Sequence, residues 1–241
     1  MPPRKILITA GNTREPIDRV RDWGNIFTGN TGYAIARAMT PIAHVDLLTS
    51  NPTHLAQAAQ NNIHASPFTS HVDLKSALAT RLAQNQYDAI FMTAAVADYT
   101  PAGTYQLLTR TPSNNDEEIW TVRNVQAEKI KSHHNQIAIV GHATEKLIDL
   151  FRHPWNHQGL LFKFKLEVGI PTDDLLKIAR ASRTASRADY LLANTLDMVQ
   201  GPTAGAYLIS PDDTHQFIPR PDLPHKLREI VTAHWNAQMS A

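Results

Sequence analysis

The sequence predicts an α/β fold: a Rossmann-like, doubly wound and mostly parallel sheet with a flap or hairpin insertion. Short apolar runs bounded by polar turns recur along the chain, and segments with helical periodicity separate most of them. This alternation is typical of parallel strands joined by crossover helices. Because 241 residues with 42% hydrophobic side chains can bury one sizeable core, we expect a single domain over residues 1–241.

The strands of the sheet are expected at five apolar runs, residues 5–10, 45–49, 87–92, 160–164 and 190–194. Helical patterns are expected at 30–39, 55–60, 74–84, 173–187 and 223–235. Residues 206–210 and 215–218 flank a Pro-Asp-Asp turn, and this spacing predicts an antiparallel hairpin at the sheet edge.

Residues 100–132 interrupt this order. The segment is polar and proline-containing, with β-like pieces at 105–109 and 119–122. We interpret it as a flap beside the sheet, with an exposed tip at 111–117. A disordered insertion is the alternative.

Composition excludes several classes of function. The net charge of +1 gives no general attraction for nucleic acid or membrane surfaces. The absence of cysteine excludes disulfides, thiolate metal sites and a cysteine nucleophile, and fits a reducing, cytoplasmic compartment. No secretory signal or membrane span is expected, because no apolar run has the required length. The 12 histidines are scattered without a metal-binding pattern, so no metal site is predicted.

The candidate site begins where the first strand ends, at Gly11. A polar run follows Gly11. In parallel sheets, the carboxyl ends of the strands border the crevice in which ligands bind. Gly29 and Gly32 open the next helix, whose free N–H groups can bind an anion. A simple strand-to-loop turn explains Gly11 but not the polar run. The pattern G-x-G-x-x-G is absent, which disfavours a dinucleotide site, and no Walker loop or G-x-S-x-G elbow occurs.

Further candidates follow other strands. Asp98 comes after the third strand, where a carboxylate can accept hydrogen bonds from a ribose or a base, or simply belong to a turn. Arg21 and Asn25 can bind phosphate or carboxylate oxygens, although their spacing alone favours a solvated surface. Lys129 belongs to a Glu-Lys-Ile-Lys run, which could supply mobile positive charge or be a solvated face.

Taken in order, these motifs resemble the phosphopantothenoylcysteine synthetase family, also called phosphopantothenate–cysteine ligase, in a free-standing form. The resemblance covers nearly the whole chain. It rests on six segments: Ile6–Asp18, Val20–Ala34, Ala94–Tyr99, Glu128–Lys131, Leu161–Glu167 and Ala188–Asn194.

The resemblance implies a nucleotide-dependent ligase of coenzyme A biosynthesis. The carboxylate of 4′-phosphopantothenate would attack the α-phosphorus of CTP or ATP, with CTP favoured, and cysteine would then attack the acyl-nucleotide. Mg²⁺ would offset triphosphate charge. Family members are homodimers in which the flap of one subunit closes the site of the other, so a homodimer is expected.

The resemblance also implies residue roles. Asn25 and Lys129 would be catalytic, Asn25 by holding the acyl-nucleotide and Lys129 by stabilising phosphate charge; Arg21 and Asn25 would bind substrate. The nucleotide-binding set would be Gly11, Ala94, Asp98, Lys129, Thr144, Glu145, Lys146, Leu147, Phe164, Arg183 and Arg187.

The chain departs from the family pattern at positions that the resemblance places near the triphosphate. Family members have two lysines about four residues apart in the helix before the 190–194 strand. In this chain that part of the helix carries Arg180, Arg183 and Arg187 instead. Serines stand at 182 and 186, where lysine could be restored. Asn30 and Ser132 also replace basic residues. Two alternatives follow: a relative with weakened or altered activity and a binding or regulatory role, or a ligase for a different carboxylate. A third alternative, a nicotinamide-dependent reductase, is disfavoured because this chain lacks the glycine pattern of such enzymes.

Overall fold

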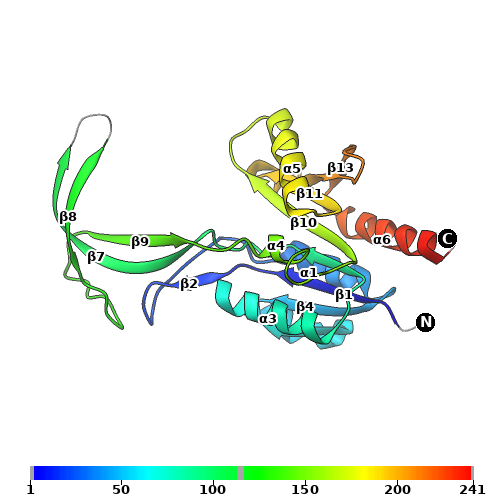
Figure 1. Ribbon diagram of the computed structural model, residues 1–241, viewed down its shortest axis with the longest axis horizontal. Coiled ribbons are helices and arrows are strands. Elements are labelled where there is room, and N and C mark those ends of the chain that lie inside the picture. The colour runs from blue at the N-terminus through cyan, green and yellow to red at the C-terminus, as the bar shows by residue number, and fades with distance from the viewer. Residues whose placement is uncertain (1–2, 113–116, 240–241) are drawn as a thin grey trace.

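The protein, described here from a computed structural model, is placed over residues 3–112 and 117–239. Its centre is an eight-stranded sheet in the order β13-β12-β11-β10-β6-β1-β4-β5 (Figure 1). The strands are β1 (Lys5–Ala10), β4 (His44–Thr49), β5 (Ile63–Pro67), β6 (Ala89–Met92), β10 (Leu160–Glu167), β11 (Tyr190–Thr195), β12 (Gly205–Ile209) and β13 (His215–Pro219).

The sheet is doubly wound and mostly parallel, as the sequence predicted. All pairs from β5 to β11 are parallel, and β12 and β13 form the expected antiparallel hairpin at one edge. From β1 the chain passes outward to β4 and β5 on one side, whereas β6 and β10 lie on the other. The strand order therefore reverses between β1 and β6, and ligands of open α/β sheets bind at the carboxyl ends of strands flanking such a point.

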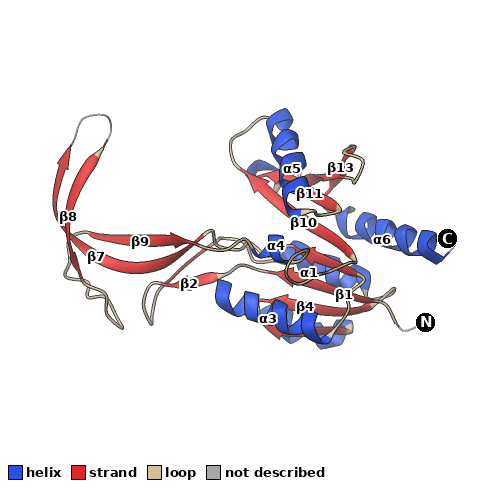
Figure 2. Cartoon of the chain, viewed as in Figure 1, coloured by secondary structure: helices blue, strands red, loops and turns tan. Residues whose placement is uncertain are grey.

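Helices cover both faces of the sheet (Figure 2). They are α1 (Asn30–Met39), α2 (Pro52–Ala58), α3 (His71–Gln84), α4 (Leu147–Leu150), α5 (Thr172–Ser186) and α6 (Leu223–Met239), with 3₁₀ turns η1 (Ala59–Asn61) and η2 (Leu196–Met198). Within the described residues, no helix is both long and apolar enough to cross a membrane.

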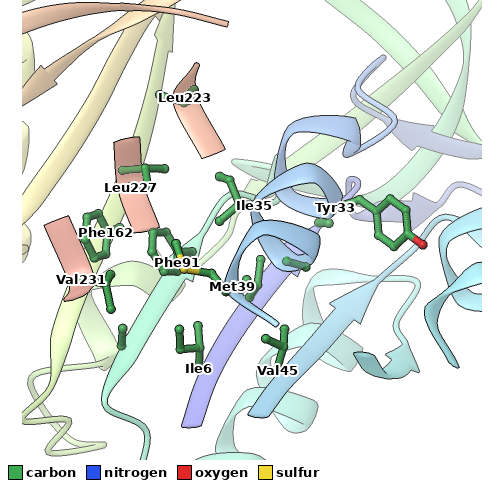
Figure 3. Close-up of a cluster of buried hydrophobic side chains, with 14 of the residues drawn as sticks. Ile6, Tyr33, Ile35, Met39, Val45, Phe91, Phe162, Leu223, Leu227 and Val231 are labelled. Carbon is green, nitrogen blue, oxygen red and sulfur yellow. The ribbon is translucent and has the colours of Figure 1, made fainter. Parts of the chain in front are cut away.

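The larger core lies between the sheet and helices α1 and α6. Figure 3 shows Phe91 of β6 and Phe162 of β10 beside the α6 side chains Leu227 and Val231. The two phenyl rings stack with their centroids 4.2 Å apart. Helices α3 and α4 pack on the opposite face, and α5 packs there against β11 and β12. Burial of both faces explains why the strands read as continuous apolar runs.

A second, antiparallel sheet projects from this body as an arm (Figure 1). It consists of β7 (Tyr99–Pro112), β8 (Glu118–Asn124) and β9 (Ile137–Ala143), in the order β8-β7-β9. A short ribbon of β2 (Arg14–Pro16) and β3 (Asp22–Gly24) lies near its base. The predicted exposed tip at 111–117 falls largely on residues 113–116, which lie outside the described residues.

Four strands were not predicted. β5 contains only one fully buried apolar residue, Ile63, because it lies at the sheet edge, so its apolar run is short. β2 and β3 are three residues each and β3 is exposed, so neither has a hydrophobic pattern. β9 is largely exposed on the arm, which leaves no alternation between buried and exposed positions.

Candidate functional site

A cleft of about 870 Å³ opens along the carboxyl ends of the central strands. It lies where the topology predicts a ligand site. Its walls come from the loop before α1, the segment after β6, the turn before α4, the second half of β10, the end of β11 and helix α5. The residues that line it include Gly11, Asn25, Gly29–Gly32, Met92–Asp98, Thr144–Ile148, Lys163–Leu166, Ser182, Asn194 and Arg220.

The N-terminus of α1 forms one wall. Gly29 caps this helix with φ of 81°, in the left-handed region that favours glycine, and no side chain caps the helix. A Cβ at Gly29 would clash with the main chain of Gly11, so glycine is also needed for the close approach of helix and strand. The first N–H groups of α1 therefore meet the cleft without a side-chain acceptor, which suits an anionic ligand.

Asn25 lies on the same side of the cleft. Its Nδ2 atom is 3.3 Å from the main-chain oxygen of Ala95, and its own main-chain oxygen accepts a hydrogen bond from the Asn12 side chain. Asn12 in turn pairs with Ala95 through an isolated β-bridge. The loop that carries Asn25 is thus fastened to the segment after β6, with its amide exposed to the cleft.

The segment after β6 is fixed from β1. The Thr9 hydroxyl oxygen accepts hydrogen bonds from the amides of Thr93 (3.0 Å) and Ala94 (3.1 Å). The amide of Ala94 is therefore used within the protein, and its contribution to a ligand is backbone shape. Asp98 is exposed at the end of the same segment, beside the cleft.

The turn at 144–147 forms the facing wall. The Thr144 hydroxyl donates to the oxygen of Ala97 at 2.6 Å, and its amide donates to the oxygen of Asp98 at 2.9 Å. From the other side, Nε2 of His71 lies 2.7 Å from the oxygen of Glu145, whose carboxylate pairs with Lys75. The turn is thus held by the segment after β6 on one side and by α3 on the other. The side chain of the next residue, Lys146, can face a ligand in the cleft.

Cations line the cleft from three places: the turn before α4, strand β10, and Arg220, which follows β13. Lys146 precedes α4 and has no ion-pair partner within the described residues. Lys163 and Lys165 come from β10; Lys165 pairs with Glu167 at 2.9 Å. Burial lowers the pKa of Lys163. Phe164, between them, is half-buried, packs against the core shared with α1 and also lines the cleft.

The structure brings together most of the sequence-predicted site. Asn25, Asp98 and Phe164 line the cleft, as do Gly11, Ala94, Thr144, Glu145, Lys146 and Leu147. The sequence analysis gave no role to Lys163. In the sequence, Lys163 stands near the middle of an otherwise apolar run. A lysine at such a position indicates that one face of the strand end is polar and that the strand end is not fully buried.

Arg21 and Lys129 do not line the cleft of a single chain. Arg21 is bound to Asp18, and its guanidinium also donates to the oxygen of Ile130 at 2.8 Å. The Ile130 amide donates to the Asp18 carboxylate at 3.1 Å. Arg21 holds the pKa of that carboxyl well below its usual range, with further help from the backbone amides of Ile130 and Val20. This cluster fastens the loop that carries Lys129 to the base of the arm.

The arginines of α5 also lie outside the cleft, in contrast to the predicted triphosphate role of Arg183 and Arg187. The helix directs Arg183 to the turn between β12 and β13, where it forms a 2.8 Å ion pair with Asp213. Arg180 contacts the same turn. Arg187 ends the helix in the left-handed conformation, with φ of 52°. The α5 residue that does line the cleft is Ser182.

No group of three or more His, Asp or Glu side chains that could hold a metal ion occurs within residues 3–112 and 117–239.

Comparisons with known proteins point to one family. Residues 1–112 match the family described as "DNA/pantothenate metabolism flavoprotein C-terminal domain". The Coenzyme A biosynthesis bifunctional protein CoaBC of Mycobacterium tuberculosis is 40% identical over 102 residues, which are 41% of this chain and 23% of that protein. The chain thus spans about a quarter of the length of this relative.

Solved structures extend the likeness to the whole fold. The DNA/pantothenate metabolism flavoprotein from Streptococcus pneumoniae is 27% identical, with a TM-score of 0.76 over 96% of this chain and 99% of that one. A Cab2 variant in complex with phosphopantothenate-cysteine shares the fold, with a TM-score of 0.65 over 97% of this chain and 89% of that one, at 14% identity.

Proposed function

We propose that this chain, whose residues 1–112 match the family described as "DNA/pantothenate metabolism flavoprotein C-terminal domain", is a phosphopantothenate–cysteine ligase of coenzyme A biosynthesis. The observation that carries the proposal is the cleft at the switch point of the sheet, lined by residues from five of the six segments that carry the resemblance. Relatives named for coenzyme A biosynthesis support it.

The proposed reaction has two steps. A carboxylate oxygen of 4′-phosphopantothenate attacks the α-phosphorus of a nucleoside triphosphate and expels pyrophosphate. The cysteine amine then attacks the acyl carbon, expels the nucleoside monophosphate and loses a proton as the amide forms. The first step brings an anion to a polyanion, so the site must supply positive charge and N–H donors.

The cleft supplies both. The N-terminus of α1 provides uncapped amides, and Lys146 provides a cation without an ion-pair partner in the described chain. Asn25, fastened to Ala95, would donate its amide to the acyl-nucleotide. Mg²⁺ would enter with the triphosphate, whose oxygens suit this cation. Its role would be to neutralise phosphate charge while the protein residues orient the reacting groups.

The nucleotide would lie across the segment after β6. The Asp98 carboxylate would accept hydrogen bonds from the ribose or the base, and Phe164 would line the base pocket. We favour CTP over ATP on the resemblance to bacterial ligases. The absence of cysteine and the coenzyme A relatives favour a cytoplasmic location.

We further propose a homodimer joined through the arm. Apolar side chains are exposed on it, among them Trp120 (48%), Val122 (40%) and Val140 (44%). An exposed apolar face on a projecting sheet is typical of an interaction surface. In such a dimer the arm of one copy would carry Arg21 and Lys129 to the cleft of the other, which would reconcile their predicted roles with their position outside this cleft.

The proposal is tested by incubating the protein with 4′-phosphopantothenate, cysteine, Mg²⁺ and each of four nucleoside triphosphates. We expect phosphopantothenoylcysteine and pyrophosphate in equal amounts. Serines at 182 and 186, if these are the positions of the family's lysines, favour a second candidate, a binding relative with weakened activity. That candidate predicts nucleotide binding without product.

A further inference from the structure

Lys163 lies at the level where the cleft begins. It pairs in register with Met92, the last residue of β6, and β10 continues beyond it to Glu167. Side chains alternate along a strand, so Lys163 points to the sheet face covered by α5, opposite to its neighbours Phe162 and Phe164. Its Nζ donates to the oxygen of Ser182 at 2.9 Å and to Oγ of Ser186 at 3.1 Å.

Among the described residues, the charge of Lys163 has no counter-ion. Within the described chain, no carboxylate lies within ion-pair distance of its Nζ, and both of its acceptors are neutral. Asp149 is the acidic group that acts on it, at longer range, against Lys146 and Lys165. The ammonium is partly desolvated, which lowers its pKa. A partly buried ammonium without a counter-ion costs free energy, and a bound anion would offset that cost.

Two of the other cations that line the cleft, Lys165 and Arg220, are engaged within the protein, whereas Lys146 has no ion-pair partner within the described residues. Lys165 pairs with Glu167, and the Arg220 guanidinium donates to the main-chain oxygen of Val199. Lys163 is therefore a pre-positioned positive charge, held by two neutral acceptors at the floor of the cleft. An ammonium held in this way can bind a phosphate oxygen as a point charge.

We propose that Lys163 binds the polyphosphate of the nucleotide and supplies, from β10, the positive charge that α5 does not supply at Ser182 and Ser186. The inference rests on the proposed function, because it assigns a phosphate-binding residue to the same cleft. The structural alternative is that Lys163 only ties β10 to α5 through its two hydrogen bonds.

The test compares triphosphate binding in Lys163→Met, which keeps the chain length and removes the charge, with the parent and with Lys177→Met. Lys177 is an exposed lysine of α5 that does not line the cleft. The probes are CTP, ATP, inorganic tripolyphosphate and the nucleosides cytidine and adenosine, measured by calorimetry. Urea unfolding of each variant reports stability.

We expect Lys163→Met to weaken binding of all three triphosphate probes by about 10- to 100-fold, the effect of one charge-assisted hydrogen bond. Nucleoside binding should change by less than about twofold, because nucleosides lack the phosphate charge. Lys177→Met should behave like the parent. Adding Ser182→Lys to Lys163→Met should restore part of the triphosphate affinity, because it returns a cation to the same wall of the cleft.

A folded Lys163→Met variant that binds triphosphates like the parent would overturn the inference, and so would a parent that binds none of the three. Lower stability with unchanged triphosphate affinity would show the structural role alone. The ligase proposal is tested separately, by product formation with the parent protein. A parent that binds triphosphate through Lys163 but makes no phosphopantothenoylcysteine would retain this inference and overturn the ligase.

Discussion

The side-chain amide of Asn25 reaches the main-chain oxygen of Ala95 at 3.3 Å, so the loop before α1 and the segment after β6 are in contact across the cleft. One N–H bond of that amide is directed to Ala95, and the other remains available to a ligand. The contact places a donor at the meeting point of the two loops, where the proposed acyl-nucleotide would lie.

Asn25→Asp should therefore slow turnover far more than it weakens nucleotide binding. The substitution removes a donor and adds a negative charge facing an anionic intermediate. We expect a loss in kcat of about 10²-fold or more, as for removal of one donor to a developing charge. Pyrophosphate release gives kcat, and calorimetry with CTP gives the binding constant of the same variant. Near-normal turnover would remove Asn25 from the mechanism.

Arg183→Ala should change stability rather than nucleotide affinity. The side chain is 12% exposed; its guanidinium pairs with Asp213 and donates to main-chain oxygens of the β12–β13 turn and of Ala188, just after α5. Removing it should lower the free energy of unfolding by about 1–3 kcal/mol. Urea denaturation measures this loss. A weaker dissociation constant for CTP or ATP, with stability unchanged, would instead support the triphosphate role first assigned to this residue.

The Asp18 cluster should make the base of the arm sensitive to acid. A carboxyl whose pKa is lowered by folding stabilises the native state above its ordinary pKa of 3.8, and this contribution is lost as the pH falls toward the lowered value. At neutral pH, Asp18→Asn should have a lower Tm than the parent, and the difference should shrink below pH 3.8. Asp22→Asn, on the neighbouring strand β3, is the control for loss of a carboxylate. A Tm difference that grows on acidification would contradict the assignment.

The arm should carry the dimer contact. Val122→Asp places a charge on an exposed apolar position of β8, whereas Thr121→Asp places one on the opposite face of the same strand. Light scattering should find the parent and Thr121→Asp as dimers and Val122→Asp as a monomer. Val122→Asp should also lose activity if Lys129 acts in the partner's cleft. A parent that is monomeric throughout the assay range would contradict this arrangement.

The strands of the central sheet could be predicted from the sequence because strands that are buried on both faces consist of long apolar runs. The prediction for α1 matches its bounds, and those for β1 and β11 match to within a residue. β10 was predicted only over 160–164, whereas it continues to Glu167. The strand there alternates lysine with apolar residues because one face borders the cleft, and such alternation falls outside the pattern of a fully buried strand.

The lining of the cleft could be predicted where it follows directly from a strand end or a short motif, as at Asn25, Asp98 and the turn after Thr144. It could not be predicted for α5. Helical spacing shows that Arg180, Arg183 and Arg187 share a face but does not show which neighbour that face meets. Packing against β11 and β12 turns Arg180 and Arg183 to the β12–β13 turn and leaves Ser182 at the cleft, beside Lys163.

The central claim is that the cleft activates a carboxylate by joining it to the α-phosphorus of a nucleotide. The most direct measurement uses 4′-phosphopantothenate labelled with ¹⁸O in its carboxylate, together with cysteine, Mg²⁺ and CTP or ATP, with the products weighed by mass spectrometry. The account predicts one ¹⁸O in the released nucleoside monophosphate, because the attacking oxygen leaves with that phosphorus, and none in pyrophosphate. Label in inorganic phosphate, or amide formation without label in the nucleoside monophosphate, would contradict it.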